Sequence, residues 1–127
     1  MITSLSAGRI ICNMLLNDPN VSKHTEKIFP VATDKAILPY ILYRRAALDH
    51  NPTKAGMPGA DTVQIEVVCY TAQYIEGVEL AEAVRAALDY KKGEKEGLVM
   101  RSCTLVDSDE GYEDDAFVQS LVFNIKI

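Results

Sequence analysis

Apolar and polar residues alternate most regularly between Thr62 and Thr71. Every second position in this segment is apolar: Val63, Ile65, Val67 and Cys69. A period of two places alternate side chains on the same side of a β-strand. The pattern therefore predicts a strand over residues 62–71 with one buried face.

Four other segments are also predicted to be strands. Residues 27–31 form a short edge strand, because Pro30 has no N–H to donate to a neighbour. Residues 40–48 are rich in aromatic and aliphatic side chains, and residues 98–106 and 117–127 form a closing pair. In the last strand Phe117, Leu121, Phe123, Ile125 and Ile127 share one face, which only Gln119 interrupts.

Helical spacing of apolar residues marks two further segments. Residues 4–16 and 74–90 each carry an apolar stripe, which in the second consists of Val78, Ala81, Val84 and Leu88, widened by Leu80 and Ala87. Pro19 ends the first helix, and residues 21–25 follow as a connector. Residues 91–97 are charged and contain two glycines, which predicts an exposed turn after the second helix.

These elements follow the order helix, three strands, helix, two strands. Short connections between strands favour antiparallel pairing, and residues 40–48 and 62–71 are the expected partners on either side of a loop at 51–59. The predicted fold is α+β, with a mostly antiparallel sheet of four to five strands and two helices packed on one face. Residues 1–127 have the length of a single domain.

Composition and charge narrow the function classes. The chain is 48% hydrophobic and 24% charged, which is ordinary for a globular protein, and no apolar run approaches the length that spans a bilayer. The N-terminus lacks the basic and apolar regions of a secretory signal, so cytoplasmic synthesis is expected. A net charge of -5 gives no footprint for direct nucleic-acid binding. Cys12, Cys69 and Cys103 lack metal or redox spacing and are expected to be small buried residues.

An acidic segment at residues 107–115 is the most conspicuous polar feature. Carboxylates attract calcium, but Gly111 and Tyr112 occupy the places where a helix-loop-helix site needs a ligand and a glycine. The segment also joins two strands. We therefore expect an exposed hairpin tip, with an acidic docking surface and a metal site as alternatives.

Catalytic signatures are absent from the sequence. His24 and His50 lie in connectors without a ligand or nucleophile at a suitable spacing, and no serine has a nucleophile-elbow context. The Gly-x-x-Gly pattern at 56–59 lies between strands, contains Pro58 and has only Lys54 as a basic neighbour, unlike a nucleic-acid clamp. No enzyme activity, cofactor or metal is expected.

The order of the elements resembles the small tail-completion proteins of long-tailed bacteriophages and prophages. The resemblance is carried by the Leu38–Tyr43 segment, the Val63–Tyr70 strand and the Leu80–Leu88 helix. It extends over nearly the whole chain and includes Ile28-Phe29-Pro30, the Gly/Pro loop and the helix that Tyr74 opens.

The resemblance implies a non-enzymatic subunit of a virion. Such a protein joins other copies of itself, as a hexameric ring, at the head-proximal end of the tail tube or at the neck, where it meets tail-tube and connector proteins. It would be made in the cytoplasm of the bacterial host and end in the virion. The loop at 51–59 and the acidic segment at 107–115 are the expected interfaces. The residues expected to make the contacts are Asn51, Lys54 and Met57 in the loop, and Asp107, Asp109, Glu110, Tyr112 and Asp114 in the acidic segment.

Two other hypotheses remain. The chain could be a small ligand-binding or regulatory α+β module with an apolar pocket under the helices. An enzyme that uses carboxylate pairs from the acidic segment is the third hypothesis.

Overall fold

A central five-stranded sheet organises the computed structural model, which describes residues 2–33, 37–50 and 61–127. The strand order is β1-β2-β3-β7-β6, and a separate hairpin is made by β4 and β5. The strands are β1 (Ile28–Pro30), β2 (Tyr40–Asp49), β3 (Thr62–Thr71), β4 (Gly93–Lys95), β5 (Leu98–Met100), β6 (Ser102–Glu113) and β7 (Ala116–Lys126). The helices are a 3-10 turn at Ser4–Ser6, α1 (Ala7–Leu16), α2 (Pro19–Ser22) and α3 (Tyr74–Leu88).

The two central strands confirm the alternation seen in the sequence. β3 and β7 pair antiparallel from Thr62 opposite Lys126 to Thr71 opposite Phe117. The side chains at alternate positions are buried on the same face: Val63, Ile65, Val67 and Cys69 of β3, with Leu121, Phe123 and Ile125 of β7. Cys103 is also buried, whereas Cys12 is only partly covered.

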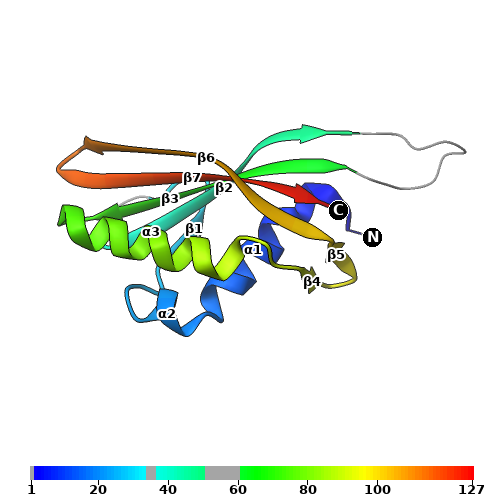
Figure 1. Ribbon diagram of the computed structural model, residues 1–127, viewed down its shortest axis with the longest axis horizontal. Helices are drawn as coiled ribbons and strands as arrows, with labels where there is room; N and C mark the ends of the chain where they lie inside the picture. Colours follow the sequence, from blue (N-terminus) through cyan, green and yellow to red (C-terminus); the bar gives the residue numbers. More distant parts are fainter. Residues whose placement is uncertain (1, 34–36, 51–60) are drawn as a thin grey trace, which may run out of the picture.

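Helices α1 and α3 cover that buried face, as predicted (Figure 1). Leu80, Val84, Ala87 and Leu88 of α3 are buried, whereas Val78 and Ala81 are only partly covered. The buried stripe of α3 is therefore rotated relative to the predicted one and includes Gly77. A Cβ at Gly77 would lie 2.8 Å from Oγ1 of Thr71. No helix in the described part of the chain is long and apolar enough to cross a membrane.

The sheet is mostly antiparallel, as predicted, and the pairing of β1 is the exception. β1 lies at the sheet edge, as Pro30 predicted, but it runs parallel to β2, with Ile28 opposite Ile41 and Pro30 opposite Tyr43. Short connections favour antiparallel pairing, but the segment between Pro30 and Tyr40 is longer than a tight hairpin requires, so its length permits a parallel pair.

The acidic segment is exposed and belongs to a hairpin, as expected, but most of it is a strand rather than a loop at the tip. β6 continues through Glu113, and its acidic residues pair with β7 as far as Glu113 opposite Ala116. Only Asp114 and Asp115 form the turn, both with positive φ, of 49° and 64°. Positive φ at both positions is typical of a two-residue type I′ hairpin. Pairing with the apolar strand β7 therefore overrides the weak β-propensity of the acidic residues.

Two other predicted connections contain regular structure. The connector expected at 21–25 begins with the end of a short helix, α2 at 19–22, which forms because the Asp18 side chain accepts from the amides of Asn20 and Val21. Residues 93–100 form the β4–β5 hairpin, so the segment is not a simple exposed turn, and the strand predicted at 98–106 is divided at Arg101. A Cβ at Gly93 would lie 2.9 Å from Cγ2 of Ile10, which shows how closely β4 packs on α1.

The β6–β7 turn yields a stability prediction. Asp115→Gly removes the Cβ that makes positive φ unfavourable and should raise the free energy of unfolding by about 1 kcal/mol in a denaturant titration. Asp115→Asn is the matched control, because it removes the same charge and keeps the Cβ. Equal stability of these two variants would contradict the assigned turn conformation.

Candidate interaction surfaces

The eight residues expected at interfaces fall into three groups. Asn51, Lys54 and Met57 lie outside the described residues. Asp107, Asp109, Glu110 and Tyr112 lie on β6, and Asp114 lies in the turn after it. Residues expected to share one loop are therefore distributed along an extended strand.

The register of β6 with β7 divides these residues between two faces. Asp107 and Asp109 lie opposite Val122 and Ser120 and project from the face away from the helices, which we call the open face. Glu110 lies opposite Gln119, which is buried on the helix side. The acidic segment therefore does not present all its side chains to a single partner.

Glu110 and Tyr112 attach the hairpin to the start of α3. The Tyr74 hydroxyl donates to Oε2 of Glu110 at 3.0 Å, and Nε2 of Gln119 donates to the same oxygen at 2.8 Å. The hydrogen bond to Glu110 raises the pKa of Tyr74. The ring of Phe117 makes edge contacts with Tyr112 and Tyr74, at centroid distances of 4.9 and 6.0 Å. These contacts give Glu110 and Tyr112 a structural role in fixing the hairpin.

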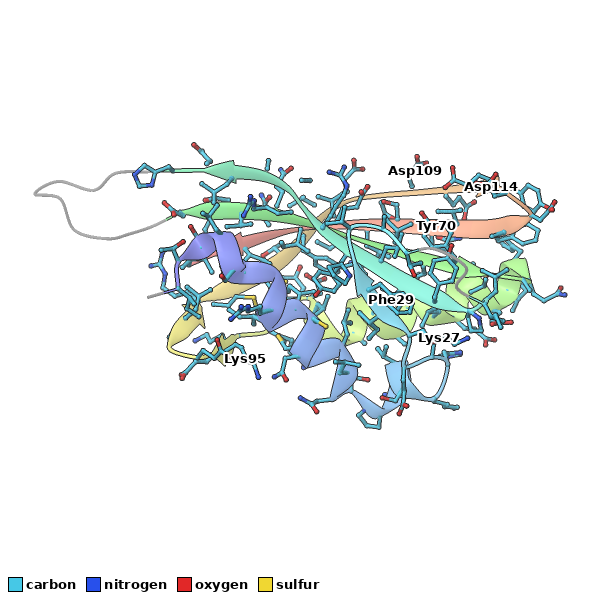
Figure 2. All side chains as sticks on the ribbon, turned by 180° about the vertical axis from the view of Figure 1, so that it is seen from behind. Lys27, Phe29, Tyr70, Lys95, Asp109 and Asp114 are labelled. Carbon is cyan, nitrogen blue, oxygen red and sulfur yellow. The ribbon has the colours of Figure 1, made fainter. Side chains whose placement is uncertain are left out.

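Aromatic rings form a row on the open face next to the acidic hairpin. The rings of Tyr40 and Tyr70 stack at 4.8 Å, and Phe29 lies 6.5 Å from Tyr40. Figure 2 shows Asp109 and Asp114 on the hairpin, followed by Tyr70 and then Phe29. A depression of about 270 Å³ lies between the tyrosines and residues 113–116. Such a surface offers apolar contact area with a carboxylate rim.

The acidic hairpin changes the ionisation of the neighbouring tyrosines. Burial is the largest cause of the raised pKa of both Tyr40 and Tyr70. The negative charges of Glu113 and Asp114 add to this effect, because a carboxylate disfavours a phenolate nearby. The two phenols therefore remain neutral hydrogen-bond donors to a higher pH than free tyrosine.

A basic groove lies between α1 and the strands β1 and β2, at the end of the sheet opposite to the acidic strand β6. It has a volume of about 440 Å³, and its cationic lining residues are Arg9, Arg44 and Arg45. Arg9 pairs with Glu96 at 2.7 Å, and Arg44 pairs with Glu66 at 2.9 Å. Nη1 of Arg45 donates to the carbonyl oxygen of Leu5 at 2.9 Å, and in the described part of the chain no carboxylate pairs with it. The signal for this groove in the sequence is a pair of adjacent arginines, Arg44 and Arg45, in an acidic chain.

In the described residues, His50 is not placed as the base of a serine nucleophile. Nδ1 of His50 lies 2.7 Å from Oδ1 of Asp61, and the Ser4 hydroxyl donates to the other oxygen of the same carboxylate. The carboxylate thus stands between the hydroxyl and the imidazole, where a serine nucleophile would need the imidazole itself. Across residues 2–33, 37–50 and 61–127, no three His, Cys, Asp or Glu side chains gather to hold a metal ion.

Comparison with known proteins gives a family match and a structural match. The family model described as "Tail completion protein gp17" matches residues 10–127. A search of curated proteins finds no match. Among solved structures, a chain of "Virion of native gene transfer agent (GTA) particle" superposes with a TM-score of 0.79 at 15% identity. The match covers 94% of this chain and 95% of that chain, and at this identity it shows a shared fold.

Titration tests whether the carboxylates beside the aromatic row act on its two tyrosines. In the Glu113→Gln, Asp114→Asn double variant, the pKa values of Tyr40 and Tyr70 should fall toward 10.0 without reaching it, because burial remains. NMR of tyrosines labelled at Cζ follows each phenol separately. A raised pKa in the folded state means that folding stability is lost as the pH rises through that pKa, so the wild type should lose stability above pH 10.

Glu79→Gln on the exposed surface of α3 is the control. This variant also removes a negative charge, but it should leave the pKa values of Tyr40 and Tyr70 unchanged. Identical titration curves for the double variant and the wild type would show that the hairpin carboxylates do not act on these phenols.

Proposed function

The chain belongs to the family of tail completion protein gp17, which makes it a structural protein of a phage tail, and we propose that it forms a ring at the head-proximal end of the tail or at the neck. The family match over residues 10–127 is the observation that carries the proposal. The shared fold with a chain of a gene transfer agent particle supports it, because that chain belongs to a virion by its title.

The surfaces of the chain support assembly with other subunits. The acidic hairpin and the basic groove belong to opposite ends of the strand order, so two copies can meet through unlike surfaces. Contacts between unlike surfaces form a ring when the rotation from copy to copy closes. We therefore propose self-association, as a hexameric ring, with tail-tube and neck or connector proteins as further partners.

We also propose that the protein is non-enzymatic and that it acts in the virion after synthesis in the bacterial cytoplasm. Its net charge of -5 opposes direct contact with a nucleic-acid backbone. The surface made of Phe29, Tyr40 and Tyr70 suits protein contacts, since aromatic residues are enriched at such interfaces.

Packing gives little support to the rival hypothesis of a ligand pocket under the helices. Side chains of α1 and α3, including Ile10, Ile11, Leu80 and Leu88, join the sheet residues in one buried cluster. Such interdigitated cores leave few voids larger than a water molecule. A metabolite that raises the melting temperature in a screen would instead favour the ligand-binding hypothesis.

The direct test of the proposed function is binding to tail ends. The full chain with a terminal tag is added to tails from a phage that lacks its own copy, and gold label is located by electron microscopy. We expect label at one end only, the end that joins heads, and restored head joining. In light scattering, self-association should give a mass that is a multiple of 14.0 kDa at rising concentration.

Tails that carry label along their length or not at all, and that remain unable to join heads, would contradict the proposal. A tagged tail-unrelated protein of similar size and charge is the control for adventitious label.

A further inference from the structure

Two strands leave long edges without a strand neighbour in the described part of the chain. β6 is last in the sheet order and pairs only with β7. Its first residues are covered, because the Leu105 amide donates to Asp89 and the Cys103 carbonyl accepts from the Tyr90 amide. Within residues 2–33, 37–50 and 61–127, no comparable contact covers the stretch 106–113. Edge strands of this kind are templates for pairing with another chain.

The second free edge lies on β2. β1 pairs only with Ile41, Leu42 and Tyr43, so the stretch 44–49 continues beyond it. Most of these residues are exposed, including Arg44, Arg45, Ala46 and Ala47. The edge opens onto the basic groove of about 440 Å³ beside α1.

The two edges carry opposite net charges. Residues 102–125 contain no lysine or arginine, and six carboxylates lie between Asp107 and Asp115. The β2 edge instead begins with two adjacent arginines and contains one carboxylate, Asp49, at its far end. Both edges are interrupted by a bulge, at Ala46 and at Val106, so neither is a uniform flat edge.

The directions and faces of the two edges are also compatible. Successive pairs in the order β2-β3-β7-β6 are antiparallel, so β6 runs opposite to β2. When copies are related by rotation about an axis along the strands, β6 of one copy meets β2 of the next in antiparallel orientation. Arg44 lies on the open face, as do Asp107 and Asp109, whereas Arg45 lies on the helix side, as does Glu110.

We propose that the β6 edge of one copy, residues 106–113, docks against the β2 edge of the next copy, residues 44–49, with Arg44 and Arg45 facing the carboxylates. This inference rests on the proposed function, because it identifies the contact that builds the ring. Main-chain hydrogen bonds between the edges supply affinity, and the charged side chains select the partner.

The same charges disfavour the competing pairs of edges. Two β6 edges would place carboxylates against carboxylates, and two β2 edges would place arginines against arginines. In the free chain the Ser108 and Glu110 amides each donate to the preceding aspartate at 2.9 Å, which protects the edge from nonspecific pairing. Charge thus selects an unlike edge and rejects a like one.

Charge reversal tests this contact. Arg44→Glu and Asp109→Lys should each weaken self-association, measured by sedimentation velocity, by about tenfold or more in dissociation constant. The Arg44→Glu, Asp109→Lys double variant restores opposite charges across the contact and should recover most of the loss. Raising the salt toward about 1 M, where the Debye length falls to about 3 Å, should weaken the wild type.

Lys23→Glu, directly after α2, and Glu79→Lys on α3 are the matched controls, since both reverse an exposed charge away from the two edges. They should assemble as the wild type does. Circular dichroism and melting temperature establish that every variant folds, and the Arg44→Ala variant separates loss of the Arg44–Glu66 ion pair from new repulsion.

The contact between unlike edges is supported if both single variants lose self-association and the double variant recovers it. If both single variants assemble and occupy tail ends like the wild type, the edge contact is wrong while the tail function stands. A double variant as weak as the singles would also overturn the contact. Wild-type protein that never occupies tail ends would overturn the proposed function and this inference together.

Discussion

The antiparallel pairing of β3 with β7 determines the rest of the structure. Ten residue pairs join these strands, from Thr62 with Lys126 to Thr71 with Phe117. A slip of one residue would move every buried side chain to the open face, so the apolar alternation of both strands fixes the register. This register places the apolar side chains on the face that packs against α1 and α3, and it leaves the aromatic row on the open face.

The same pairing explains how an acidic sequence becomes a strand. Residues 107–113 have little tendency to extend by themselves, and their carboxylates repel one another. β7 holds them in place through its backbone, while Gln119 and Tyr74 bind Glu110. The result is a sheet edge with concentrated negative charge, at the far side of the strand order from the arginines of β2. We propose that the charge on these two edges acts in the contact between copies.

The sequence predicted the elements that depend on strong periodic patterns. The strands at 40–48, 62–71 and 117–127 and the helix beginning at Tyr74 are confirmed, as are the α+β class and the family. The parallel β1, the short α2, the β4–β5 hairpin and the extension of β6 were missed, because each depends on tertiary pairing or on a single cap such as Asp18. Of the expected interface residues, the five in the acidic segment are located, but alternation divides them between two faces. Arg44 and Arg45 were counted only as strand residues, since a neighbouring groove is not visible in sequence.

Hydrogen exchange on the full chain, free and bound at tail ends, tests whether copies assemble through the β2 and β6 edges. Amides in 44–49 and 106–113 should exchange more slowly after assembly, while the central amides of β3 and β7 are already protected and should change little. Unchanged exchange at both edges, with new protection confined to the exposed surface of α3, would contradict assembly through these edges.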